Sequence, residues 1–199
     1  MKSFSRCCST FLLLALAGIG TSCAGVLHLG APGSHHKHGS QWKGVAQVVA
    51  VMQPTAGNKA AGTVVFTQTK DGVKVEANIT GLNPDSEHAI HVHQYGDVRL
   101  DNGKGTGGHY NPDGHDHGLP AKDKRHAGDL GNLKADANGA ASYTIIAKNI
   151  SVAGLLNPVV GRGVIIHAKV DDGGQPTGNA GARISQGVIG AARPAAAAK

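Results

Sequence analysis

The sequence predicts an all-β domain, built as an antiparallel sandwich or barrel. Seven short runs of strand-like composition lie between positions 45 and 190, and turn sequences such as KDG, NPDS, ADANG and DDGG separate them. No long stretch between these runs has the 3.6-residue apolar period of a helix. Glycine contributes 30 of 199 residues and aromatic residues only 4%, as in a fold with many turns and close backbone approaches.

Residues 1–23 have the pattern of a secretory signal peptide. Basic Lys2 and Arg6 precede an apolar run from Phe11 to Ile19, after which small residues follow. The apolar run is too short to span a bilayer comfortably. We therefore expect export to the periplasm or cell envelope.

Processing near Cys23 has two alternatives. The sequence GTSC resembles the lipobox at which bacteria lipidate a cysteine, although Gly20 stands where that motif normally has leucine. Ordinary cleavage after Ala24 is the other route, and only lipidation would attach the protein to a membrane. All three cysteines, Cys7, Cys8 and Cys23, lie in or at the end of this segment, so the rest of the chain has none for a disulfide.

Flanking segments enclose a predicted domain at residues 43–191. Residues 24–42 are rich in glycine, serine and histidine, which predicts a flexible tether. The tether contains His35, His36 and His38, either a metal-recruiting arm or a solvated run. Residues 192–199 predict a disordered tail. The formal charge of +6 is scattered and lacks an aromatic platform, which argues against nucleic-acid binding.

The predicted strands leave two long loops. The strand-like runs lie at residues 45–52, 62–69, 73–82, 88–95, 141–147, 163–170 and 183–190. Residues 97–133 and the Gly-rich residues 171–182 have loop composition. A long loop in a compact domain is usually functional or disordered. The first loop holds His109, His115, His117 and His126, which favours function.

Two histidines lie close together on one predicted strand. His91 and His93 are separated by one residue, and a strand turns alternate side chains to opposite faces, so both rings should face one side. Ile90 and Val92 should then face the other. A shared metal ion and a solvent-facing pair are both compatible with this pattern.

Two sets of metal-binding donors follow from the remaining histidines. His109, His117 and His126 are spaced by eight and nine residues and Asp129 follows, a set of nitrogen and oxygen donors that suits structural Zn²⁺. Such a zinc could order a loop that has neither core nor disulfide. His91, His93 and His167 with one histidine shared from the loop would form an all-nitrogen site, which favours Cu²⁺.

Six blocks of the sequence resemble the copper–zinc superoxide dismutase family, particularly its bacterial exported branch. They are HVHQYGD, GGHYNP, HGLP, RHAGDLGN, GRGVIIHAKVDD and GNAGARISQGVIG, and the likeness covers about residues 43–191. It implies an eight-stranded Greek-key barrel with a long metal-binding loop.

The resemblance also implies roles for individual residues. His91, His93, His109 and His167 look like copper ligands, and His109, His117, His126 and Asp129 look like zinc ligands, with His109 bridging the two ions, one of each per chain. Asp171 matches an aspartate that orients one copper histidine and one zinc histidine. Arg183 matches the arginine that receives the substrate anion.

The implied reaction is the dismutation of superoxide to O₂ and H₂O₂. A bridging imidazolate at His109 could leave reduced copper, take up a proton and deliver it in the second half-cycle. A copper or zinc carrier, or a scaffold without turnover, is the alternative, and the presence of Arg183 and Asp171 favours the enzyme. The sequence leaves the choice between monomer and homodimer open.

The sequence departs from the family at a disulfide. Val98 and Gln186 stand where the bacterial branch has its two cysteines. Losing such a link typically costs ~2–5 kcal/mol in small secreted domains, so a substitute is expected. Packing of Val98 and hydrogen bonds from Gln186 to the loop backbone are the expected substitutes.

Overall fold

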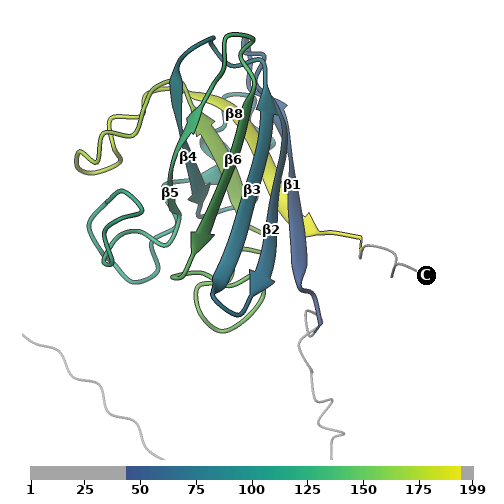
Figure 1. Cartoon of the computed structure of the whole chain (residues 1–199), viewed down its shortest axis with the longest axis vertical. Coiled ribbons are helices and arrows are strands. Elements are labelled where there is room, and N and C mark those ends of the chain that lie inside the picture. The colour runs from purple at the N-terminus through teal and green to yellow at the C-terminus, as the bar shows by residue number, and fades with distance from the viewer. Residues whose placement is uncertain (1–43, 194–199) are drawn as a thin grey trace, which may run out of the picture. The chain divides into compact units, whose positions relative to one another are not determined.

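The computed structural model of the chain describes residues 44–193 (Figure 1). The predicted signal peptide with Cys23, the whole predicted tether, Lys43 at the start of the predicted domain, and the last six residues of the predicted tail lie outside the described residues. None of the described residues belongs to a helix long and apolar enough to cross a membrane.

Eight strands form one antiparallel sheet within the described residues, as the predicted all-β class requires. They are β1 (Gln47–Pro54), β2 (Ala61–Thr69), β3 (Gly72–Thr80), β4 (Glu87–His93), β5 (Asp129–Lys134), β6 (Ala141–Ala147), β7 (Gly163–His167) and β8 (Arg183–Ala191), with one 3₁₀ turn, η1 (Lys104–Thr106). The order of strands is β5-β4-β7-β8-β1-β2-β3-β6. Each of the seven predicted runs overlaps one of these strands.

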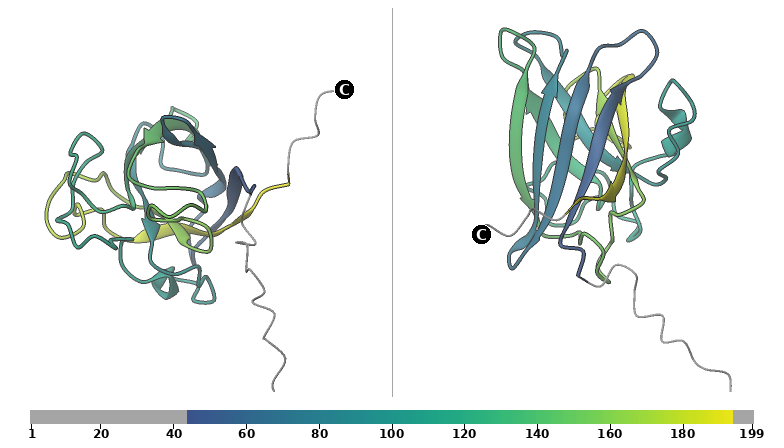
Figure 2. Two further views of the ribbon diagram at one scale, coloured as in Figure 1. Left: turned by 90° about the horizontal axis from the view of Figure 1, so that it is seen from below. Right: turned by 90° about the vertical axis from the view of Figure 1, so that its right-hand side faces the viewer.

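The strand order is that of a nearly closed Greek-key barrel. The chain crosses from β3 to β4 and returns from β5 to β6, so β6 lies beside β3 and β7 lies between β4 and β8. β5 and β6 are the two ends of the order, and the Tyr143 hydroxyl on β6 donates a hydrogen bond of 2.5 Å to the Leu130 carbonyl on β5. Figure 2 shows the sheet curling round on itself.

Strand β5 corrects one expectation. The sequence DLGNLK was assigned to the loop at 97–133, but residues 129–134 form a strand that pairs with β4. Its alternation is weak because Gly131 and Asn132 interrupt two leucines, Leu130 and Leu133, both fully buried. Pairing and burial therefore decide this strand, and the long loop ends at Gly128.

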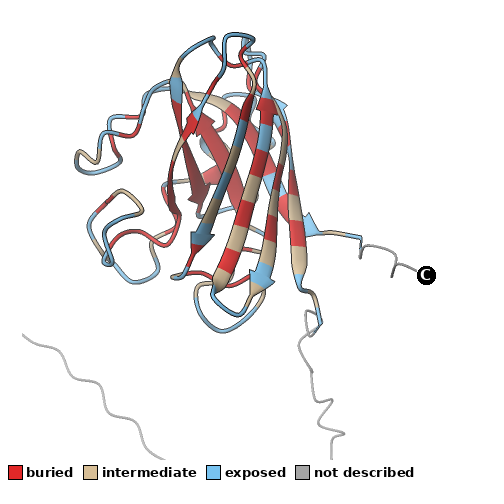
Figure 3. Ribbon diagram, in the orientation of Figure 1, coloured by how far each residue is buried: buried red, intermediate tan, exposed pale blue. Residues whose placement is uncertain are grey.

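The core lies inside the barrel. Buried residues alternate with more exposed ones along β1 and β3, and Figure 3 shows this banding on β3. Phe66 is the largest fully buried side chain of this core, and burying such a side chain contributes about 1.5–3 kcal/mol. Strand β4 differs because all its residues after Glu87 are buried. Ile90 and Val92 belong to the core, so the two histidines between and after them face away from it under the loops.

The two long connectors project from the same side of the barrel, beside β4 and β5 (Figure 1). The two connectors, β4–β5 and β7–β8, contact each other: the side-chain amide of Gln175 in the β7–β8 connector donates a hydrogen bond to the His117 carbonyl in the β4–β5 connector at 2.8 Å. This pair of connectors covers the outer face of β4.

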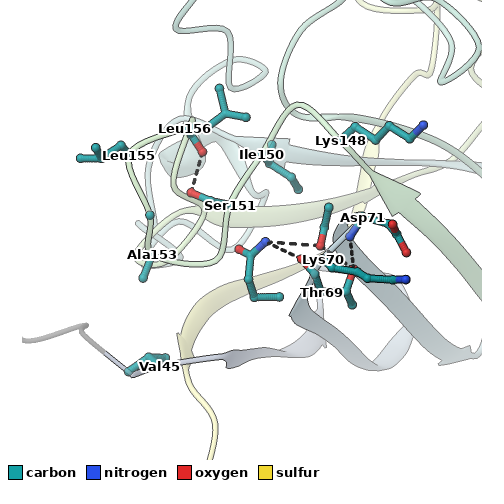
Figure 4. A pocket seen from close by; sticks show the side chains of 13 residues that line it. Val45, Thr69, Lys70, Asp71, Lys148, Ile150, Ser151, Ala153, Leu155 and Leu156 are labelled. Atoms are coloured by element: carbon teal, nitrogen blue, oxygen red, sulfur yellow. Dashed lines mark hydrogen bonds between the residues drawn. The ribbon is translucent and has the colours of Figure 1, made fainter.

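A separate groove of about 830 Å³ lies between the β2–β3 turn and the β6–β7 connector (Figure 4). Its apolar lining includes Ile150, Leu155 and Leu156, and no histidine takes part. The groove therefore has none of the donors of a histidine metal site.

Candidate metal centre

Four histidines from two adjacent strands and one loop converge outside the barrel. His91 and His93 lie on β4, His167 ends the neighbouring β7, and His109 is joined to His93 by an isolated β-bridge. One nitrogen from each lies within 4.8 Å of the others. We call His91, His93, His109 and His167 the four-histidine group. Its closest rings are those of His91 and His109, with centroids 3.9 Å apart.

Hydrogen bonds behind the rings fix which nitrogen is free. His93 Nδ1 donates to the Gly107 carbonyl at 2.9 Å and His167 Nδ1 to the Gly181 carbonyl at 3.2 Å. His91 Nε2 donates to Asp171 Oδ2 at 2.9 Å. The opposite nitrogens, His91 Nδ1, His93 Nε2 and His167 Nε2, are buried without a hydrogen-bond partner among the described residues. Leaving a buried polar atom unpaired costs about 1–3 kcal/mol, so three in one place fit a metal ion.

Burial keeps three rings of this group, those of His91, His93 and His167, neutral. It lowers the pKa of His91 to about 4, although the hydrogen bond that His91 donates to Asp171 opposes this shift, and it lowers the pKa of His167 to about 3. Burial also holds the pKa of His93 well below its usual value. A neutral imidazole keeps the lone pair that a metal requires.

A second group shares His109 with the first. His109, His117, His126 and Asp129 also offer donor atoms within 4.8 Å of one another, and we call them the histidine–aspartate group. His109 Nδ1 lies 3.0 Å from Asp129 Oδ1, and His117 Nδ1 lies 3.0 Å from Asp129 Oδ2. His126 Nδ1 lies 3.3 Å from Asp129 Oδ1. The group therefore combines three imidazoles with one carboxylate.

The Asp129 carboxylate is held ionised at the start of β5. Its Oδ2 accepts hydrogen bonds from the backbone N–H groups of Gly118 and His126, at 3.0 and 3.1 Å. Burial alone would raise the pKa of Asp129, but the hydrogen bonds from His109 and His117 outweigh it and hold the pKa far below the usual range. A charged oxygen among three nitrogens is a donor set that suits zinc.

Asp171 connects the two groups from behind. Its Oδ2 binds His91 Nε2 and its Oδ1 binds His117 Nε2, both at 2.9 Å. Burial opposes its charge, but the hydrogen bonds from these two rings outweigh burial and hold the Asp171 pKa far below the usual range. For His117, burial lowers the pKa, but Asp129 and Asp171 together raise it to about 9.

Two amides and a glycine behind the rings were not foreseen from the sequence. The Asn132 side chain pairs with the backbone of Asp171 through two hydrogen bonds, of 3.0 and 2.7 Å. Gln175 pairs in the same way with the backbone of His117, at 3.1 and 2.8 Å. At Gly178 a side chain would collide with Asp171 Oδ1. These contacts join residues 39 and 58 positions apart, so local spacing carries no signal of them.

Arg183 lies half-buried beside the four-histidine group. Its Nη1 donates to the Gly103 carbonyl at 2.7 Å and to Thr106 Oγ1 at 3.0 Å, and its Nη2 donates to the Gly107 carbonyl at 2.7 Å. The same Gly107 carbonyl accepts the hydrogen bond from His93. Burial lowers the pKa of Arg183, but a guanidinium remains charged in proteins.

Two described histidines left out of the predicted ligand sets, His88 and His115, lie outside both groups. His88 is buried between Ser86 Oγ and the His167 carbonyl, each at 2.8 Å, which fits the structural role expected for it. His115 Nδ1 lies 3.3 Å from the Arg125 carbonyl. Every residue predicted as a ligand falls in one group or both, and Asp171 and Arg183 lie against them.

Comparisons with known proteins agree with this geometry. The model of the copper/zinc superoxide dismutase (SODC) family matches residues 60–189, a range that includes both groups and Arg183. A solved structure titled "Crystal Structure Analysis of the clock protein EA4" is 39% identical, with a TM-score of 0.67, and the match covers 74% of this chain and 95% of that chain. The matched range exceeds half of the chain, and on this ground the chain belongs to the copper/zinc superoxide dismutase family.

Proposed function

We propose that this protein is a superoxide dismutase that converts superoxide to O₂ and H₂O₂. The observation that carries the proposal is the pair of buried donor groups that share His109, with Arg183 fixed beside one of them. Family membership supports the same reaction.

The donor chemistry supports one metal in each group. The four-histidine group offers nitrogen donors only, which suits copper, and the histidine–aspartate group offers nitrogen and oxygen, which suits zinc. Copper, when bound, would supply one-electron chemistry in both directions, while zinc has no redox chemistry of its own. Asp171 would keep one ring of each group in a fixed orientation.

Arg183 and His109 are the residues we propose to act on the substrate. The Arg183 guanidinium supplies a fixed positive charge and N–H donors for a small anion. His109 turns Nδ1 to Asp129, and Nε2 lies on the opposite edge of the ring. We infer that Nε2, when it is not bound to a metal, takes up a proton from solvent and passes it to the reduced substrate.

A metal carrier without turnover is the second candidate function. The solved relative described above is named as a clock protein, and its title does not state an enzymatic activity. A carrier needs the donor groups but has no use for an arginine held beside them. The placement of Arg183 therefore favours the enzyme.

We further propose that the protein is exported. The basic and apolar pattern of residues 1–23 supports a signal peptide, and a lipid on Cys23 would add membrane attachment. Mass spectrometry of the protein purified from its host would distinguish a lipidated Cys23 from cleavage after Ala24.

A superoxide-decay assay on purified protein, with copper and zinc measured in the same sample, tests the function. We expect superoxide removal, and a fall of about 10–100-fold for Arg183→Ala, because a hydrogen bond to a charged group contributes about 1.5–3 kcal/mol. Arg193→Ala is the matched control, since Arg193 is exposed and lies beyond the end of β8, outside both donor groups. One copper per chain without superoxide removal would reject the enzyme in favour of the carrier.

A further inference from the structure

The position of Arg183 depends on one loop. All its side-chain hydrogen bonds end on Gly103, Thr106 and Gly107, within residues 97–107, which we call the arginine-holding loop. A hydrogen bond is sensitive to tenths of an ångström, so the guanidinium follows any shift of this loop. The orientation of Arg183 is therefore decided by what holds the loop against β8.

Thr106 is the inner contact of this loop. It is fully buried, its hydroxyl donates to the Gly103 carbonyl at 2.9 Å, and the same oxygen accepts from Arg183 Nη1. The hydroxyl thereby joins two of the three acceptors of Arg183 into one unit. The loop and the guanidinium are consequently expected to move together.

Gln186 ties this loop to the strand that carries Arg183. It lies three residues after Arg183 on β8 and is 6% exposed. Its Nε2 donates to the Leu100 carbonyl at 3.0 Å and to the Val98 carbonyl at 3.4 Å, which confirms the hydrogen bonding expected from the sequence. The described residues contain no cysteine, so these hydrogen bonds stand where the family resemblance implies a disulfide.

The two atoms of the Gln186 amide differ in use. Both N–H groups of Nε2 have acceptors, whereas Oε1 is buried without a partner among the described residues. A glutamine that only filled space could be replaced by an apolar residue, which would avoid the unpaired oxygen. The donor is therefore the part of Gln186 that matters to the loop.

We propose that Gln186 is a positioning residue for Arg183: its amide holds the arginine-holding loop against β8, and the loop in turn holds the guanidinium beside His93. The claim that Arg183 binds the substrate anion rests on the proposed function. The claim that Gln186 holds the loop and the guanidinium, which we call the positional part, concerns the folded chain alone and is measured separately.

Hydrogen–deuterium exchange of the metal-free full chain tests the positional part. Gln186→Met keeps length and removes the donor, and we expect at least threefold faster exchange in residues 97–107 with β1–β3 unchanged. Ser185→Ala is the matched control, because this buried neighbour donates only to the Gln53 carbonyl on β1. Gln186→Glu, which places a carboxylate against two carbonyls, should act in the same direction. Unchanged exchange in residues 97–107 for both variants would overturn the proposal.

A double-mutant cycle tests whether Gln186 acts through Arg183. Azide affinity of the copper-loaded protein, read from its visible spectrum, should fall about 3–10-fold for Gln186→Met in the native background. The same substitution should change nothing in an Arg183→Ala background, because the affected group is gone. An equal loss in both backgrounds would show a general structural effect and reject the coupling. If the protein had no dismutase activity, hydrogen exchange and azide affinity could still be measured, so the failure of the proposed function and the failure of this proposal are distinguishable.

Discussion

The two donor groups share a histidine but stand on different supports. Three members of the four-histidine group lie on β4 and β7, paired strands whose other faces belong to the core. In the histidine–aspartate group only Asp129 lies on a strand, and the three histidines come from the 94–128 connector. One group is therefore fixed by the barrel, and the other depends on contacts among its own members.

The supporting hydrogen bonds differ in the same way. His93 and His167 donate to the backbone carbonyls of Gly107 and Gly181, on the two connectors, so no carboxylate holds these two rings. His117 is held between two carboxylates, Asp129 and Asp171, and by Gln175 at its backbone. From this comparison we infer that the first group keeps its geometry without a metal, whereas the second group needs its metal to become ordered.

His109→Ala should have the largest effect, because it removes a donor from both groups. Loss of an outer hydrogen-bond partner already costs 10–100-fold in metal affinity, so loss of the shared donor should weaken both copper and zinc by more than about 100-fold. Competition with a chelator measures each affinity. His115→Ala, a change six residues along the same connector and outside both groups, should leave them unchanged. A loss of one affinity without the other would show that His109 serves one group only.

Zinc addition to the metal-free protein should have the next largest effect. A ligand that binds only the folded state stabilises it by about 2.7 kcal/mol when its free concentration is 100 times its dissociation constant. Chemical denaturation with and without zinc measures this gain. Hydrogen exchange through local opening should slow in residues 109–128 and stay unchanged in β4. Equal slowing of exchange in residues 109–128 and in β4 would mean that the two donor groups depend equally on zinc for their order.

Much of the site was predictable because its donors are chemically distinctive. Histidine pairs on one strand face, histidines spaced along a loop and an aspartate that follows them point to two donor sets before any coordinates are known. The alternation of apolar residues likewise predicted seven of the strands. The shared role of His109 came from resemblance, and the structure brings His109 into both groups.

The remaining features depend on contacts between distant residues. β5 was missed because Gly131 and Asn132 interrupt its pattern, and pairing with β4 is what makes it a strand. Asn132 and Gln175 were missed because amides bind backbone groups at many positions and have no characteristic spacing. The orientation of each ring, which decides the free nitrogen, also comes only from partners far away in the chain.

Gln175→Ala should have the smallest effect and the sharpest selectivity. Gln175 binds only the backbone of His117, so its loss should loosen the histidine–aspartate group and leave the four-histidine group intact. Each neutral hydrogen bond contributes about 0.5–1.5 kcal/mol, so zinc affinity should fall by about tenfold. Chelator competition for both metals provides the measurement, with Gln53→Ala as the control, since Gln53 is exposed on β1 and outside both groups. An equal loss of copper affinity would show that the four-histidine group also depends on the Gln175 loop. The inferred difference between the two groups would then be wrong.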